Sequence, residues 1–149
     1  GNLSNILDTD NGPGMDGRVG KVRMDGKEVF KHAVEKLSSS LVEAIKAANI
    51  NINDINYLIP HQANIRIIDA ISKKLNFPNE KVIKTLDLHA NTSAASIPLA
   101  LDVAISNKKI KNGDIIALNA IGGGLSWGAS ILKYGKPDWR FVILCIKWS

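Results

Sequence analysis

The stretch that decides the fold is residues 56–75, which reads NYLIPHQANIRIIDAISKKL. Its first residues form an apolar run that Pro60 closes, and this composition predicts a short buried strand over Asn56–Pro60. Apolar or small residues then recur every three or four positions, which predicts a helix over Asn64–Leu75 that Phe77-Pro78 ends. A strand followed at once by a helix is the repeating unit of α/β domains.

The same alternation extends in both directions from this stretch. Upstream, apolar residues spaced three or four apart predict a helix at about Lys27–Ala48, with Asp25 and Glu28 at capping-box spacing before it. The order α-β-α-β-α-β-β indicates an α/β fold with layers α-β-α. Downstream, the expected elements are strand Val82–Leu86, helix Ser93–Ser106, strand Asp114–Ala120, turn Gly122–Gly124 and strand Ser126–Lys133.

The last of the predicted helices and the two ends of the chain depart from this pattern. Helix Ser93–Ser106 is apolar almost all round, so we expect it to be buried between two layers, with Pro98 in its first turn. Residues 1–26 are rich in turn formers and are expected to be loop-like. Residues 135–149 form an atypical tail, whose run Phe141–Ile146 is exposed or pairs with something outside the pattern. The half-domain itself is placed at 27–134.

Composition bounds the class of protein. The chain has 149 residues, enough for one domain, and 45% hydrophobic content, which argues against disorder. Lys and Arg number 19 against 14 Asp and Glu, and the resulting charge of +5 favours an acidic partner. One cysteine excludes an internal disulfide and favours a reducing compartment. No apolar run is long enough to span a membrane, and the missing initiator Met suggests that the chain starts inside a longer protein.

Three predicted strand ends carry groups that suit chemistry. His61 follows the first strand, Asn91-Thr92-Ser93 follows the second, and Gly122-Gly123-Gly124 follows the third. Ligands of α/β folds bind at the carboxyl edge of the sheet, so convergence of the three is the informative feature. Each has an ordinary alternative: His61 is as well explained structurally, Asn91-Thr92-Ser93 as helix caps, and the glycines as a tight hairpin. A glycine N–H there could also stabilise an oxyanion.

Other residues of reactive type are interpreted as structural. His32 lies beside the apolar stripe of the first helix, and His89 precedes a capping cluster. Gly124–Gly128 matches the G-x-S-x-G motif of hydrolases, but a strand and not a helix is predicted after it, and no His follows Ser126. Cys145 lies in an apolar run, where burial would disfavour the thiolate. The chain also lacks the Lys-Ser/Thr of a P-loop and aromatic residues interleaved with its lysines.

Four segments together resemble β-ketoacyl-acyl-carrier-protein synthase III, a family of thiolase-fold condensing enzymes built of two similar α/β halves. They are PHQANIR at 60–66, NTSAASIP at 91–98, GGGLSWG at 122–128 and MDGKEVF at 24–30. The resemblance runs from about residue 1 to residue 134 and implies the C-terminal half only. The family's nucleophilic cysteine lies in the other half, and Cys145 does not match it.

The resemblance also implies roles for individual residues. His61 and Asn91 are similar to two members of a Cys-His-Asn triad, and Gly123 is similar to the oxyanion-hole glycine. Asn64, Ile121 and Phe30 would bind substrate, with Asn64 near a pantetheine arm and Ile121 in the acyl pocket. Arg66 would dock the carrier protein, and Lys73 and Lys74 extend this surface along one helix. Three departures stand out: Ala90 replaces a family glycine, Ile121 replaces a frequent Phe, and the tail after Gly135 extends past the family's usual end.

The implied reaction transfers an acyl group from coenzyme A to the cysteine and then condenses it with malonyl-acyl carrier protein, with loss of carbon dioxide. No cofactor is expected beyond the coenzyme A thioester, which is a substrate. The implied partners are acyl carrier protein, coenzyme A thioesters and the missing N-terminal half, in a cytoplasmic homodimer, without nucleic acid or membrane. Two alternatives stay open: a non-catalytic remnant or split-enzyme subunit, and, more distantly, a basic binding module.

Overall fold

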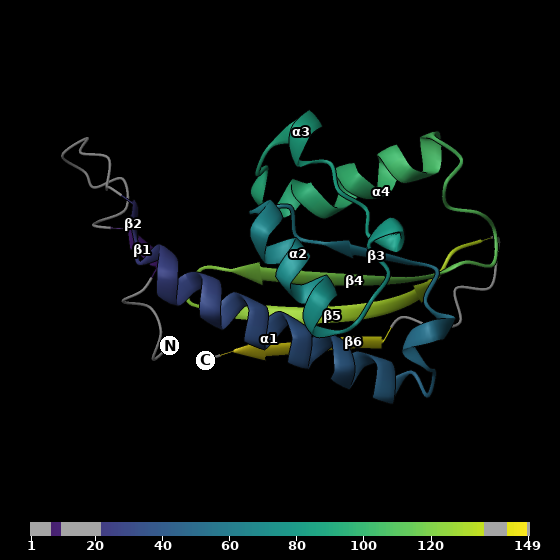
Figure 1. Cartoon of the computed structure of the whole chain (residues 1–149), viewed down its shortest axis with the longest axis horizontal. Helices are drawn as coiled ribbons and strands as arrows, with labels where there is room; N and C mark the ends of the chain where they lie inside the picture. Colours follow the sequence, from purple (N-terminus) through teal and green to yellow (C-terminus); the bar gives the residue numbers. More distant parts are fainter. Residues whose placement is uncertain (1–6, 10–21, 136–142, 149) are drawn as a thin grey trace.

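The fold is a mixed sheet with helices on both faces. In the computed structural model, which describes residues 7–9, 22–135 and 143–148, the strand order of the sheet is β3-β4-β5-β6. β3 (Tyr57–Pro60) runs parallel to β4 (Ile115–Gly122), which pairs antiparallel with β5 (Ser126–Lys133). Figure 1 shows α1 (Gly26–Ala47) and α2 (Ile65–Lys74) in front of this sheet and α4 (Ser96–Ser106) along its upper edge. The predicted α/β class with layers α-β-α is confirmed.

The front layer contains the larger part of the core. Residues of α1 and α2 pack on β4 and β5 in two clusters that include Leu37, Leu41 and Ile68. Asp25 is the N-cap of α1 and its carboxylate accepts from the N–H groups of Lys27 and Glu28, as the sequence predicts. Both helices match their predicted ranges to within one or two residues.

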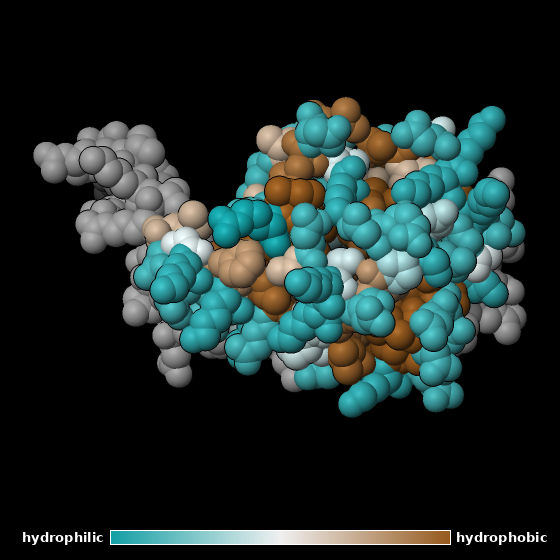
Figure 2. Space-filling view, viewed as in Figure 1, coloured by the Kyte–Doolittle hydropathy of each residue, from teal (hydrophilic) through white to brown (hydrophobic). Residues whose placement is uncertain are grey.

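The layer formed by α4 differs from its prediction. The predicted helix Ser93–Ser106 divides into a 3-10 turn, Ser93–Ala95, and the α-helix Ser96–Ser106, with Pro98 in the first helical turn. Only Ser96, Ala100 and Ala104 of α4 are buried, because only one side of the helix contacts the sheet. The expectation that this helix is buried between two layers is therefore wrong for this chain alone. Figure 2 shows hydrophobic side chains at the surface near α3 and α4, while hydrophilic ones dominate the face of α1 and α2.

The predicted strand Val82–Leu86 is also corrected. Only Val82 forms a parallel bridge, with Leu58, and the N–H of Ile83 donates to Leu58 O. Beyond that point the main chain bonds to a side chain, because the carboxamide of Gln62 accepts from Thr85 N–H and donates to Ile83 O. Leu86 already begins a short helix, α3 (Leu86–His89).

The chain ends carry strands that the sequence did not predict. β1 (Leu7–Thr9) and β2 (Val22–Met24) pair antiparallel, which corrects the loop-like assignment of residues 1–26, although the turn formers at 11–14 lie outside the described residues. β6 (Ile143–Trp148) pairs antiparallel with β5. Of the tail run Phe141–Ile146, the described residues 143–146 therefore pair with β5 of the same chain. None of the helices in the described part of the chain is long and apolar enough to cross a membrane.

Candidate active site

A cavity of about 520 Å³ opens beside β4, β5 and the start of α4. Its lining brings together residues from all three segments that the sequence singled out: His61 after β3, Ser93 and Ser96 from the segment after Asn91, and Gly122 at the hairpin. Parts of the three segments therefore share one cavity. Asn91 and Gly123 themselves are not among the lining residues, which are His61 and residues from 93–97, 118–122 and 126–130.

His61 is fixed by contacts to two elements. Its backbone N–H donates to Asn119 O of β4 at 2.7 Å, which extends the parallel pairing of β3 by one residue. Its ring nitrogen Nδ1 lies 2.7 Å from the Ser96 hydroxyl at the first turn of α4. The ring is half-buried, and this desolvation lowers the pKa of His61 below its ordinary value. The imidazole is therefore held in place and favoured in its neutral form.

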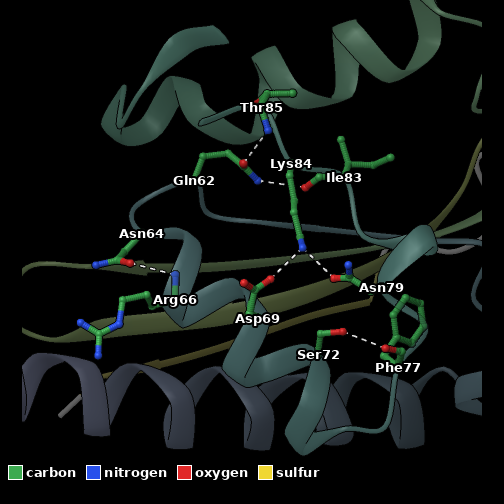
Figure 3. A network of polar contacts seen from close by, with 10 residues as sticks. All are labelled: Gln62, Asn64, Arg66, Asp69, Ser72, Phe77, Asn79, Ile83, Lys84 and Thr85. Atoms are coloured by element: carbon green, nitrogen blue, oxygen red, sulfur yellow. Dashed lines mark hydrogen bonds and ion pairs between the residues drawn. The ribbon is translucent and has the colours of Figure 1, made fainter. Parts of the chain in front are cut away.

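Gln62, directly after His61, is buried and bonds to the backbone of neighbouring segments; Figure 3 shows its bonds to Ile83 and Thr85. Its Nε2 donates to Pro60 O at 2.7 Å and to Ile83 O at 3.2 Å, while its Oε1 accepts from Thr85 N–H at 2.9 Å. Only 1% of Gln62 is exposed, so these bonds replace water for every group involved. The side chain ties the end of β3 to the segment that leads toward Asn91.

Asn91 is exposed and makes a local bond. Its Oδ1 accepts from Ser93 N–H at 3.0 Å, a local Asx-turn bond, whereas the cap position of the following 3-10 turn is Thr92, whose side chain makes no cap bond. The residue before it, Ala90, has φ 54° and ψ −155°, a conformation that glycine adopts readily and alanine does not. Ser93 also has a positive φ of 54°. The bond at Oδ1 orients the carboxamide and leaves its Nδ2 hydrogens for another acceptor.

The glycine turn joins β4 to β5 as predicted. Gly124 has φ +117°, so this position needs glycine for its backbone conformation. Gly123 is exposed, and a Cβ built there would meet no atom within 4 Å. Packing inside the described chain therefore gives no reason for glycine at 123. Ser126 begins strand β5 and not a helix, which confirms that the G-x-S-x-G match is not a hydrolase nucleophile elbow.

Of the three predicted substrate-binding residues, Ile121 lines the cavity and Phe30 and Asn64 do not. Ile121 lines the cavity and also packs against the cluster around Leu37, and Phe30 of α1 packs on the same cluster. Asn64 is the exposed N-cap of α2, and its Oδ1 accepts from Arg66 N–H at 2.9 Å. Each therefore has a structural contact within the chain.

The predicted docking residues lie along α2. The guanidinium of Arg66 stands 5.7 Å from the ring centroid of Phe30, so it rests on an aromatic face and stays exposed. Lys73 and Lys74 are exposed in the last turn, about 10 Å further along the helix axis. Lys84, in contrast, bonds to Asp69 and Asn79, and Figure 3 shows it occupied between them. Arg66 thus lies at the start of α2 and Lys73 and Lys74 at its end, and none of the three has an ion pair among the described residues.

The remaining candidates behave as structural residues. His32 is half-buried on α1 and lies 3.6 Å from the Glu28 carboxylate, and His89 ends α3. Among the residues that the structure describes, no group of His, Cys, Asp or Glu could hold a metal ion. Cys145 is in β6, opposite Ala129, and its side chain lies outside the described part of the structure.

Sequence reasoning missed two residues of the site, Gln62 and Ser96. Both stand inside the motifs quoted above, next to residues that were singled out. A polar residue directly after a strand-ending histidine was the available signal for Gln62. Ser96 offered none, because it contacts His61 across 35 residues of sequence and only the folded chain brings them together.

Comparison with known proteins gives the same family at each level. The sequence profile of the 3-oxoacyl-[acyl-carrier-protein] synthase III C terminal matches residues 45–134. A β-ketoacyl-[acyl-carrier-protein] synthase III from Wolbachia pipientis wMel is 60% identical over 129 residues, which are 87% of this chain and 41% of that protein. The protein of the same name from Sphingopyxis alaskensis is 50% identical over 133 residues, with coverages of 89% and 41%. The chain thus spans about two fifths of the length of these relatives.

Solved structures agree with the sequence matches. The crystal structure of 3-oxoacyl-[acyl-carrier-protein] synthase III from Aquifex aeolicus VF5 has a TM-score of 0.82 and 45% identity, covering 90% of this chain and 41% of that one. The corresponding structure from Pseudomonas aeruginosa PAO1 has a TM-score of 0.84 and 34% identity, with coverages of 91% and 42%.

Proposed function

Because this chain belongs to the 3-oxoacyl-[acyl-carrier-protein] synthase III family, we propose that it supplies the C-terminal half of such a condensing enzyme. The reaction is the decarboxylative condensation of an acyl-coenzyme A primer with malonyl-acyl carrier protein, which initiates fatty acid synthesis. The supporting observation is the cavity at which His61, the segment after Asn91 and the glycine hairpin meet. The chain spans about 41% of its relatives, so the nucleophilic cysteine would come from the N-terminal half.

In this proposal the residues of this chain stabilise negative charge. Decarboxylation of a malonyl thioester leaves an enolate, whose oxygen needs hydrogen-bond donors that do not themselves ionise. A neutral His61 imidazole and the Nδ2 hydrogens of Asn91 suit this role, and burial favours the neutral ring. The N–H of Gly123 would donate to the oxyanion that forms when the carbanion attacks the acyl thioester. No cofactor enters this scheme; coenzyme A is part of the substrate.

The apolar surfaces of the chain fit the proposal that a second half covers them. α4 buries only three of its residues, and Leu88 of α3 is 61% exposed. In the complete protein, which we propose to be a cytoplasmic homodimer, such surface would pack on the N-terminal half. The half-domain would then be residues 27–134, with 1–26 as entry segment and 135–149 as tail.

The substrate and carrier positions follow from the same proposal. Ile121 and Phe30 would contact the acyl chain, and Asn64 the pantetheine arm near the start of α2. Arg66, with Lys73 and Lys74, would attract the acidic carrier protein. Arg66→Glu should weaken the use of carrier-protein thioesters and spare coenzyme A thioesters, and the loss should shrink as salt rises. A salt-independent loss with both substrates would contradict a docking role.

The deciding experiment is complementation. The chain is co-expressed with the N-terminal half of a synthase III relative, and acylation of the cysteine and malonyl decarboxylation are measured separately. His61→Ala and Asn91→Ala should each lower decarboxylation by roughly 10²–10³-fold, as the loss of one preorganised donor does, and affect acylation far less. His32→Ala, a histidine outside the cavity, is the matched control and should stay near wild type.

Other outcomes would contradict parts of the proposal. Equal loss of both steps would mean that His61 and Asn91 act on the nucleophile or on folding. Condensation by the chain alone that disappears in Cys145→Ser would place the nucleophile in this chain. The alternative is a non-catalytic remnant or a subunit of a split enzyme. A folded monomer that ignores the added half would favour the remnant.

A further inference from the structure

We propose that Ser96 is a positioning residue that fixes His61 in the tautomer with its proton on Nε2. The starting observation is the 2.7 Å contact between Ser96 Oγ and His61 Nδ1. A contact of this length is a hydrogen bond in which either group could donate. The second contact of the hydroxyl decides the direction.

Ser96 Oγ already accepts a hydrogen bond. The backbone N–H of Gln62 donates to it at 3.2 Å, and Ser96 is only 1% exposed. A buried hydroxyl that accepts from one N–H still has a hydrogen to place, and an unsatisfied buried donor is costly. Within the described residues His61 Nδ1 is the one acceptor in reach. The hydroxyl therefore donates to Nδ1, and the neutral ring carries its proton on Nε2.

The surroundings of the ring favour the same state. Among the residues that line the cavity, His61 alone has an ionisable side chain, so no carboxylate there supports an imidazolium. A protonated ring would bring two donors, Nδ1–H and Gln62 N–H, onto one hydroxyl and leave the Ser96 hydrogen without its acceptor. Burial also disfavours the charge. The partner of Nδ1 is thus a hydroxyl that keeps the ring neutral, where an acidic partner would stabilise its positive form.

The consequence concerns what His61 can offer to a ligand. With Nδ1 engaged at the start of α4, Nε2 is the nitrogen left to face the cavity, and it acts as a donor. An Nε2–H donor suits a carbonyl or enolate oxygen and does not suit the abstraction of a proton. This catalytic meaning rests on the proposed function, whereas the tautomer itself does not.

The test is imidazole NMR on the full 149-residue chain, labelled with nitrogen-15. Long-range proton–nitrogen correlations distinguish a protonated from an unprotonated ring nitrogen, and His61→Gln identifies the signals of His61. The wild-type spectrum should contain the Nε2–H form. In Ser96→Ala the ratio of Nε2–H to Nδ1–H should fall roughly 5- to 10-fold, the effect of losing one hydrogen bond. Ser96→Thr keeps the hydroxyl and should restore the ratio.

Controls make each outcome decisive. Ser39→Ala removes an exposed serine on α1 that contacts Lys36 O, and it should leave the His61 signals unchanged. An Nδ1–H form in the wild type overturns the proposal without any variant, so a poorly folded Ser96→Ala cannot leave it undecided. An unchanged tautomer in a folded Ser96→Ala overturns it as well. Because this readout needs no turnover, failed complementation would count against the proposed function only.

Discussion

Two junctions of the candidate site are built in opposite ways. The His61 junction, residues 60–64, is anchored by Gln62, which bonds to Pro60, Ile83 and Thr85, and by the bond of His61 N–H to Asn119 O. The Asn91 junction, residues 90–93, is mostly exposed and has two non-glycine residues at positive φ. The first is stable through contacts inside the chain. The second holds a strained conformation with one side-chain bond, from Ser93 N–H to Asn91 Oδ1, and local backbone bonds such as that of Ala90 N–H to Leu86 O.

This difference indicates how the site would depend on the N-terminal half that the proposed function requires. Buried, satisfied polar groups keep their geometry without help from a partner. A strained backbone persists where its surroundings determine it, and the described chain gives the Asn91 junction few such surroundings. We infer that the His61 junction is preorganised in this chain and that the Asn91 junction gains its support from the other half.

The largest expected effect tests the anchor of the first junction. Gln62→Ala leaves Pro60 O, Ile83 O and Thr85 N–H buried without partners, so the free energy of unfolding should fall by about 3 kcal/mol or more. Asn91→Ala, at the other junction, loses one exposed side-chain bond to Ser93 N–H and should cost only about 0.5–1 kcal/mol. Urea unfolding of both variants measures the contrast. Similar losses in the two variants would remove the distinction between the junctions.

A smaller and opposite effect tests the strain in the second junction. Ala90→Gly relieves a conformation that costs a non-glycine residue about 1–3 kcal/mol, against roughly 0.4–1 kcal/mol of added chain entropy in the unfolded state. We expect a net gain of about 1 kcal/mol in thermal or urea unfolding. Ala94→Gly is the matched control, because Ala94 is exposed in the next turn without a positive φ, and it should be destabilising. Destabilisation by Ala90→Gly would mean that the junction is unstrained.

The smallest expected effect sharpens the account of His61. Burial lowers its pKa in the folded chain, so the unfolded chain binds the proton more readily. Stability from this source is complete above the ordinary pKa of 6.5 and is lost as the pH falls below it toward the lowered value. In His61→Gln, this part of the pH dependence should disappear. Unfolding free energies between pH 5 and pH 8 measure it, and parallel curves for the two proteins would contradict it.

Much of the fold follows from local pattern. Periodicity and end signals placed α1, α2, β3 and β5 within one or two residues, because these elements each bury a face whose spacing is visible in the sequence. The prediction of a full strand over Val82–Leu86 was wrong, because after Val82 the backbone groups of Ile83 and Thr85 bond to the Gln62 side chain. Pattern also did not place β6, although its partner β5 is the strand that directly precedes it in the chain.

The sequence by itself determined the α/β class, the resemblance of its motifs to one family, and the three segments that meet at the candidate site. It did so because strands, helices and their caps depend on neighbours a few residues apart. Only the tertiary structure decided which groups touch His61 and how the Asn91 junction is held. The Ser96 contact spans 35 residues and that of Gln62 with Thr85 spans 23, and no local spacing encodes bonds that exist only when the layers pack together.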